Sequence, residues 1–246
     1  MEKFTIRIAG HVVAVTSKSR YSRKNCEDYL CDKEPEFAVE LTQGDIDFER
    51  VVAEQERAME GLSKKVFADY VLERTALQRK IAEKFFEYDI LLFHGSVIAI
   101  DGEAYLFTAP CGTGKSTHTR SWMTLFGDRA VMVNDDKPFL HISSSGVLAY
   151  GSPWNGKHGL STNVCVPLKG ICLLHRGNEN VICGADAASL RDLLIHQLHI
   201  PNDPVLARRV ATLAEILLDQ LPLWEMHCNK DIDAARVAHS AMSIWV

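Results

Sequence analysis

The sequence lacks several features that would assign it to a function class at once. No hydrophobic run among its 246 residues approaches the length of a membrane span, and its first residues lack the charged-then-apolar order of a signal peptide. It also lacks an excess of positive charge, since its net charge is −5. Nucleic acids and anionic membranes usually require a basic face. We therefore expect a cytoplasmic protein that has neither nucleic acid nor membrane as a partner.

Paired cysteine spacings are missing as well. Cys26 and Cys31 are too far apart for a Cys-x-x-Cys motif, and the other five of the seven cysteines stand alone. An odd number of cysteines in a cytoplasmic chain is typical of reduced thiols. Internal repeats and low-complexity segments are also absent. With 47% hydrophobic residues, the chain is able to bury one substantial core, alone or with a smaller satellite domain.

The most informative segment, residues 104–122, reads as an apolar strand, a turn of small residues and a helix. The turn ends Gly-Thr-Gly-Lys-Ser-Thr, with Ala109 where the usual phosphate-loop pattern has its first glycine. Backbone N–H groups of such a turn surround phosphate oxygens, and the helix N-terminus adds its dipole. The pattern assigns Lys115 to the β- and γ-phosphates and the Ser116 hydroxyl to Mg²⁺. The residues expected to contact the nucleotide are Cys111, Gly112, Thr113, Gly114, Lys115, Ser116 and Thr117. The alternative is a glycine-containing turn with a solvated lysine.

A pair of acids, Asp135 and Asp136, follows the apolar run at residues 131–133. Phosphoryl transfer needs one group that holds Mg²⁺ and another that orients or deprotonates the acceptor, and paired carboxylates at a strand end supply both. Adjacent carboxylates also repel each other, which favours a bound cation or raises one pKa. The alternative is an Asx-type turn after the strand. Because the pair lies about one helix downstream of Lys115, we favour the functional interpretation.

The apolar pattern predicts two unequal parts, a small β-rich N-terminal part at residues 1–65 and a catalytic part at residues 66–246. Strands are expected within residues 4–16 and again within residues 36–48, where one or two would lie around a glycine. The charged stretch after them is expected to be a linker or an exposed helix. A long helix is predicted over residues 66–88.

Seven apolar runs between residues 90 and 174 predict strands, interrupted by one helix over residues 115–126. The hairpin-like spacing Ile100-Asp101-Gly102-Glu103 indicates antiparallel pairing rather than regular strand–helix alternation. A helical C-terminal tail is expected, with prolines between its helices. The predicted helices of the tail span residues 189–199, 204–220 and 231–243. The predicted fold class is therefore α/β (α+β), with a mixed, largely antiparallel sheet that carries the phosphate loop.

Three motifs in order resemble a known family. These are Phe-His-Gly-Ser at residues 93–96, the phosphate loop at residues 112–117 and Val-Asn-Asp-Asp at residues 133–136. Together they resemble the catalytic domain of the HPr kinase/phosphorylases, which share a nucleotide-binding fold with phosphoenolpyruvate carboxykinases. The resemblance covers about residues 90–176 and implies a mixed sheet rather than the parallel sheet of most phosphate-loop proteins.

The resemblance also implies roles for single residues. Lys115 and Ser116 would serve the phosphates and Mg²⁺, and Asp135 would be the metal-linked acid. Asp136 would be the base that accepts the proton of the acceptor hydroxyl, and His94 would orient or tune it.

The chain departs from that family at residues 150–160, where the family carries an acidic signature that contains Arg-Gly. The Ser-Pro-Trp-x-Gly-Lys pattern found here is similar to small HPr-kinase-like proteins of peptide-modification systems, including lasso-peptide kinases. At an active site Trp154 would form an apolar wall, and Lys157 would neutralise charge on the transferring phosphoryl group. Arg176 is a weaker candidate for the same electrostatic task. The alternative for the segment is an ordinary surface turn.

The sequence therefore predicts an ATP-dependent kinase that uses Mg²⁺ and phosphorylates a hydroxyl group of a peptide, protein or small molecule. The predicted catalytic residues are His94, Lys115, Asp135, Asp136 and Lys157, and the predicted metal ligands are Ser116 and Asp135. The alternatives are a nucleotide-binding sensor or scaffold without transfer, a regulatory ATPase and a carboxykinase-like enzyme. The acceptor, the choice among ATP, GTP and pyrophosphate as donor, the role of residues 1–65 and assembly into a homo-oligomer all stay open.

Overall fold

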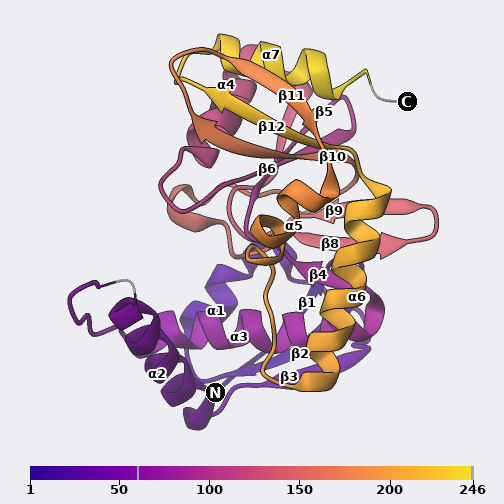
Figure 1. The fold of residues 1–246 in the computed structure, drawn as a ribbon. Helices are drawn as coiled ribbons and strands as arrows, with labels where there is room; N and C mark the ends of the chain where they lie inside the picture. The colour runs from indigo at the N-terminus through magenta and orange to yellow at the C-terminus, as the bar shows by residue number, and fades with distance from the viewer. Residues whose placement is uncertain (60, 245–246) are drawn as a thin grey trace. The chain divides into compact units, whose positions relative to one another are not determined.

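The computed structural model describes residues 1–59 and 61–244, and the chain divides into two compact units, Met1–Lys84 and Phe85–Val246 (Figure 1). The division falls at the end of the long helix predicted over residues 66–88. Across the described residues, no helix combines the length and the apolar character that crossing a bilayer requires. Each unit is described by itself below.

The first unit contains a small sheet. β1 (Glu2–Ile8) and β2 (His11–Ser17) form an antiparallel hairpin. Its turn residues, Ala9 and Gly10, both have positive φ angles, as the tight type I′ turn requires. β3 (Phe37–Glu40) pairs parallel to β2. The strands predicted within residues 4–16 are therefore confirmed.

Helices make up more of the first unit than the sequence pattern indicated. They are α1 (Arg20–Asn25), α2 (Gln43–Met59) and α3 (Asp69–Phe85). Within residues 36–48 the predicted strand before Gly44 is confirmed by β3, but the prediction of a strand at or after Gly44 was wrong, because the chain is helical from Gln43 onward. The Thr42 hydroxyl accepts from the Asp45 N–H at 3.3 Å, and the Asp45 carboxylate accepts from the Thr42 N–H at 2.9 Å. This reciprocal pairing is a capping box, which starts a helix here.

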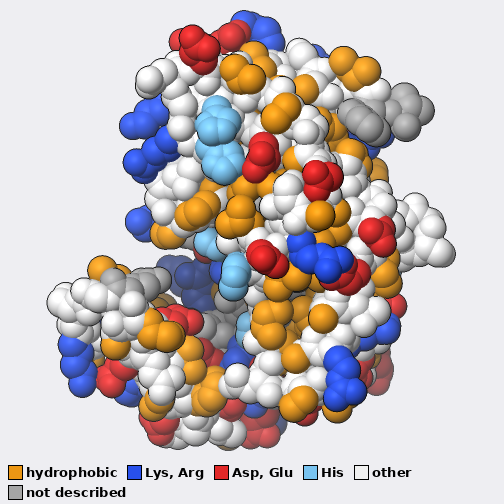
Figure 2. Space-filling view, in the orientation of Figure 1, with side chains coloured by type: hydrophobic (Ala, Val, Ile, Leu, Met, Phe, Trp, Pro, Cys, Tyr) orange, Lys and Arg blue, Asp and Glu red, His pale blue; other side chains and the backbone are white. Residues whose placement is uncertain are grey.

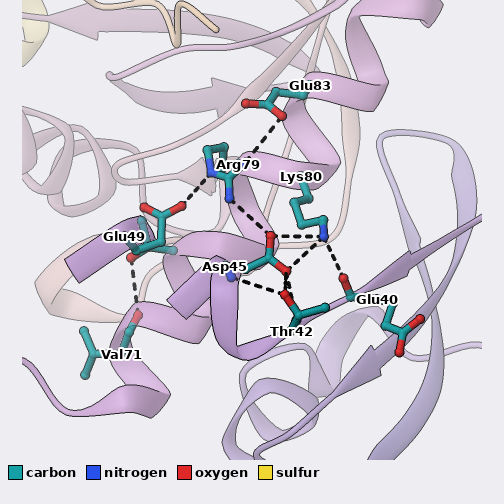
Figure 3. Close-up of polar contacts among 9 residues, drawn as sticks. Glu40, Thr42, Asp45, Glu49, Val71, Arg79, Lys80 and Glu83 are labelled. Carbon is teal, nitrogen blue, oxygen red and sulfur yellow. Dashed lines mark hydrogen bonds and ion pairs between the residues drawn. The ribbon is translucent and has the colours of Figure 1, made fainter. Parts of the chain in front are cut away.

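Charged side chains join α2 to α3 within this unit (Figure 3). Arg79 on α3 donates to Glu49 on α2 at 2.6 Å, and its Nη2 atom lies 3.5 Å from Asp45. Lys80 also contacts Asp45, at 3.1 Å. Glu49 is only 5% exposed, so Arg79 supplies the opposite charge that a buried carboxylate requires. The network fixes the two helices against each other.

The second unit is built on a mixed sheet. Its strands are β4 (Ile90–Leu92), β5 (Ser96–Ile100), β6 (Glu103–Thr108), β7 (Ala130–Asn134), β8 (Phe139–Ser143), β9 (Gly146–Tyr150), β10 (Cys165–Arg176), β11 (Val181–Ala185) and β12 (Leu223–Cys228). They pair in the order β4-β8-β9-β10-β6-β5-β7, and β12 pairs with both β10 and β11. Most neighbours are antiparallel, but β10 runs parallel to β6 and to β12. The predicted fold class, a mixed and largely antiparallel sheet, is confirmed.

Helices cover both faces of this sheet. They are α4 (Lys115–Phe126), α5 (Ala187–Ile195), α6 (Pro204–Gln220) and α7 (Asp233–Met242). Along β5, Val97 and Ala99 belong to the hydrophobic cluster that includes α5 and α6 residues, whereas Ile98 and Ile100 belong to the cluster that includes α4 and α7 residues. Successive side chains of a strand point to opposite faces, so the sheet is buried on both. This burial explains the continuous apolar runs in the sequence.

The surface carries both signs of charge. On the face of the molecule shown in Figure 2, acidic, basic and apolar side chains are interspersed, and histidine side chains form a small group. In the second unit, the paired strands β10 and β12 place His175 opposite His227, and the centroids of their stacked rings are 4.8 Å apart. A mixed surface of this kind agrees with the modest net charge of −5.

Candidate active site

The sheet topology brings the phosphate loop and the acidic pair to one edge. The loop follows β6, and Asp135 and Asp136 follow β7. Both strands pair antiparallel with β5, so they run in the same direction and end at the same edge. Ser96 at the start of β5 lies between the two ends, opposite Phe107 on β6, and its neighbour Val97 lies opposite Asn134 on β7.

A cleft of about 500 Å³ lies at this edge. The wall of the cleft contains all five predicted catalytic residues, both predicted metal ligands and most of the predicted nucleotide contacts. The cleft is lined by His94, Cys111, Gly112, Gly114, Lys115, Ser116, Thr117, Arg120, Asp135, Asp136, Gly156, Lys157 and His158. Thr113, also predicted to contact the nucleotide, lines a neighbouring cavity. Segments separated by more than 60 residues in the sequence thus share one concave surface.

The phosphate loop has a shape that needs glycine. Gly112 and Gly114 have φ angles of 78° and 128°, which L side chains rarely adopt. Lys115 follows as the first residue of α4 and is only 9% exposed, and its Nζ atom donates to the Ala109 carbonyl oxygen at 2.8 Å. Burial lowers the pKa of the Lys115 ammonium, while nearby Cys111 and Asp136 oppose that shift. The loop therefore holds a partly desolvated cation at the base of the cleft.

Asp135 is held by a short chain of hydroxyl groups. It is 4% exposed, and its Oδ1 atom accepts from the Ser96 hydroxyl at 2.7 Å. The Ser96 hydroxyl also lies 2.9 Å from the Thr119 hydroxyl on α4. These contacts tie Asp135 to the helix that begins with Lys115. The sequence marked Ser96 as part of the Phe-His-Gly-Ser motif but assigned it no role.

The oxygen donors in this cleft fit a magnesium site. The Asp135 carboxylate and the Ser116 hydroxyl line the same wall. Mg²⁺ prefers oxygen ligands and is usually held by one or two carboxylates together with substrate phosphates. Among the described residues, no group of three or more His, Cys, Asp or Glu side chains is arranged to hold a metal ion. A magnesium ion in this cleft would therefore depend on a phosphate ligand for part of its coordination.

An Asx-type turn shapes the segment after β7. The Asn134 Oδ1 atom accepts from the backbone N–H groups of Asp136 at 2.8 Å and Lys137 at 2.6 Å. The Asn134 Nδ2 atom donates to the Ser152 hydroxyl and carbonyl oxygens, both at 3.0 Å. The turn that the sequence suggested as an alternative to a functional role is thus present, and it positions Asp136 in the cleft wall.

His94 lies beside Asp136. Its Nε2 atom is 3.5 Å from the Asp136 Oδ1 atom. Burial lowers the pKa of His94 to about 3, helped by the positive charges of Lys137 and Lys115. The imidazole is therefore neutral near pH 7, which makes it an uncharged neighbour of Asp136 and a poor base.

The segment from residue 150 to residue 160 closes one side of the cleft. Gly156 has a φ angle of 69°, and a Cβ atom added there would lie 3.1 Å from the Asp136 Cβ atom. Glycine therefore lets this turn approach Asp136 and places Lys157 in the cleft wall. The expectation that Trp154 forms an apolar wall of the site was wrong. Trp154 is 3% exposed and packs edge-on against Phe139 in the core, where its large ring anchors the turn.

Two arginines contact this region: Arg120, which the sequence analysis did not single out, and Arg176, which it named as a weaker candidate for neutralising charge. Arg120 lines the cleft, and its Nε atom donates to the Ser116 carbonyl oxygen at 3.1 Å. The signal in the sequence was the four-residue spacing between Ser116 and Arg120, which places the two residues on one face of a helix. Arg176 supports the phosphate loop, because its guanidinium donates to the carbonyl oxygens of Gly112 at 2.5 Å and Thr113 at 3.4 Å.

Comparison with known proteins finds similar chains among solved structures. No protein-family model matches the chain, and no curated protein matches it. Among solved structures, the chain is similar to the HPr(Ser) kinase/phosphatase from Coxiella burnetii, with 10% sequence identity and a TM-score of 0.35. The similarity covers 61% of this chain and 91% of that chain.

Proposed function

We propose that the Phe85–Val246 unit is a kinase that transfers the γ-phosphoryl group of ATP to a hydroxyl group of a peptide, protein or small molecule. One observation carries this proposal: a phosphate loop with Lys115 and Ser116 shares a single cleft with Asp135, Asp136 and His94. Phosphoryl transfer is catalysed mainly by positioning and charge neutralisation, and this cleft contains groups for both.

Each group has a defined task in the proposed reaction. The loop N–H groups and Lys115 hold the phosphate chain in the cleft. Asp136 accepts the proton of the acceptor hydroxyl as its oxygen bonds to the γ-phosphorus, and the bond between that phosphorus and the β–γ bridging oxygen breaks to release ADP. Neutral His94 orients the Asp136 carboxylate. Lys157 neutralises charge on the group in transfer.

Asp135 and Ser116 would hold Mg²⁺, which when bound would neutralise charge on the phosphate oxygens. The rigid attachment of Asp135 to Ser96 supports this assignment, because a ligand fixed before binding loses little conformational entropy. We therefore assign Asp136, and not Asp135, to the acceptor. The turn that carries Asp136 is fixed separately by Asn134.

The test is transfer of label from γ-labelled ATP. The wild-type protein is incubated with labelled ATP, Mg²⁺ and an acceptor source, either a peptide encoded beside the gene or a cell lysate. We expect label on a hydroxyl of an acceptor. Asp136→Asn should lower the transfer rate by about 10² to 10⁴-fold while ATP affinity stays within about twofold. Asp128→Asn, at an exposed acid outside the cleft, is the matched control and should keep the parent rate.

Other outcomes identify the alternatives. Label found only as free phosphate would indicate a regulatory ATPase and overturn the kinase assignment. ATP binding without release or transfer of label would indicate a sensor or scaffold. Transfer at the parent rate in Asp136→Asn would remove that residue from the role of base.

A further inference from the structure

A second cavity shares residues of the phosphate loop with the cleft. Its volume is about 570 Å³, within the range of small-molecule sites. Its lining comes mainly from the phosphate loop after β6, the end of β10 at residues 174–177 and the end of β12 with the residues after it, at 228–231. Residues of α4 and Ala234 on α7 complete the lining. Strands β6, β10 and β12 run parallel, so their carboxyl ends meet at one edge. Ligands of α/β proteins commonly bind outside the carboxyl ends of parallel strands.

The cavity and the catalytic cleft adjoin at the phosphate loop. Gly112, Gly114 and Thr117 line both of them. A ligand that places its phosphates in the cleft therefore reaches the second cavity with the part of the molecule attached to those phosphates. A donor made of phosphate alone leaves the second cavity unused.

The lining of the cavity suits a flat, partly polar group. Leu174 and Ala234 are 2% and 1% exposed and supply apolar walls. Arg176 places a planar guanidinium at the cavity, fixed by its bond to the Gly112 carbonyl oxygen, and guanidinium planes stack on aromatic rings.

His118 also lines the cavity and keeps one ring N–H group. Its Nε2 atom accepts from Trp122 Nε1 at 3.0 Å, and burial lowers the pKa of His118 to about 4. A neutral imidazole that accepts at Nε2 carries its proton on Nδ1. The lining thus combines apolar contact, a stacking surface and a hydrogen-bond donor.

We propose that this cavity binds the base and ribose of the phosphoryl donor, so that the donor is a nucleoside triphosphate and not pyrophosphate or inorganic polyphosphate. This inference rests on the proposed function of the cleft. It assigns the nucleoside to residues that follow β10 and β12, more than 50 residues away from the phosphate loop in sequence.

The test compares ATP with tripolyphosphate, which has the phosphate chain alone, by calorimetric titration in the presence of Mg²⁺. The wild-type protein should bind ATP at least about tenfold more tightly than tripolyphosphate. Ser121 lines the cavity but not the cleft. Ser121→Phe should fill the cavity, weaken ATP binding at least about tenfold and leave tripolyphosphate binding within about twofold. Thr124→Phe, at an exposed position of the same helix, should change neither affinity.

Equal affinities for ATP and tripolyphosphate in the wild-type protein would overturn this inference. So would an unchanged preference for ATP in Ser121→Phe, or equal loss of both ligands in Ser121→Phe and in the smaller Ser121→Leu. In each of these results the wild-type protein still binds tripolyphosphate, so the proposed phosphate site is not contradicted. Absence of tripolyphosphate binding to the wild-type protein would instead contradict the proposed function of the cleft, so the two failures are distinguishable.

Discussion

Two clusters of charged side chains in this protein are built in opposite ways. In the first unit, Arg79 lies 2.6 Å from the Glu49 carboxylate and Lys80 lies 3.1 Å from that of Asp45. In the cleft of the second unit, the Lys115 ammonium is bonded to a neutral backbone carbonyl and the Asp135 carboxylate to the neutral hydroxyl of Ser96.

The pKa shifts follow the same difference. Burial acts to raise the pKa of Asp45, but hydrogen bonds from Thr42 and Lys80 lower it overall. Burial lowers the pKa of Lys115, since the surrounding groups do not compensate for the lost water. Buried charges that pair with each other are already neutralised within the fold. Charges that lie close together but bond only to neutral groups favour a ligand that neutralises them. This difference supports a structural role for the network on α2 and α3 and agrees with the proposed role of the cleft as the binding site.

The largest effect on stability is expected at Arg79. Arg79→Ala leaves the buried Glu49 carboxylate without its closest cation, which should cost roughly 3 kcal/mol of the free energy of unfolding. Hydrogen exchange read by mass spectrometry should show lost protection in α2 and α3, with ATP affinity unchanged. Arg23→Ala, at an exposed arginine of the same unit, should change protection little. A similar small effect of Arg79→Ala would mean that the network is not structural.

A smaller effect, about 2 kcal/mol, should distinguish the stability of the second unit from that of the first in acid. Burial lowers the pKa of His118 to about 4, from an ordinary value of 6.5. Below pH 6.5 the unfolded chain binds a proton that folded His118 excludes, so stability is full above pH 6.5 and falls as the pH drops toward 4. Between pH 7 and pH 5 the loss from His118 alone should be about 2 kcal/mol, and buried His94 in the same unit acts in the same direction. The pKa of Asp45 is lowered from 3.8, so its contribution to the first unit is lost only below about pH 4.

Tryptophan fluorescence is the measurement for this comparison, because all four tryptophans in the sequence follow residue 85. The urea midpoint of the fluorescence transition should fall between pH 7 and pH 5. His118→Gln, which keeps an acceptor for Trp122 but does not titrate, should reduce that fall. An identical midpoint at both pH values would contradict the assignment of His118 as a buried neutral group.

Local signals predicted much of the fold but only part of the site. The spacing around Asp101 and Gly102 predicted a tight turn, and β5 and β6 form that hairpin with both residues at positive φ. The helix predicted over residues 115–126 has those bounds in the structure. Patterns of this kind depend on neighbours a few residues apart, which is why a single sequence carries them.

The features that the sequence did not predict depend on distant contacts. The bond from Ser96 to Asp135 joins residues 39 positions apart and follows from the order of strands in the sheet. The burial of Trp154 depends on its contact with Phe139, and the hairpin of β8 and β9 separates the two residues in sequence. Asn134 was counted in a catalytic motif, yet its observed contacts shape the backbone around Asp136. Composition and spacing do not contain strand order, so these contacts required the folded chain.

The central claim is that Lys115 and its loop bind the phosphates of a nucleotide. Calorimetric titration of ATP with Mg²⁺ into the wild-type protein and Lys115→Ala tests it most directly. Lys169→Ala, which removes a lysine that pairs with Glu103 at 3.4 Å outside the cleft, is the matched control. We expect ATP to bind the wild-type and control proteins equally, and Lys115→Ala to weaken binding by at least about tenfold, or 1.4 kcal/mol. Equal ATP affinity in all three proteins would contradict the account.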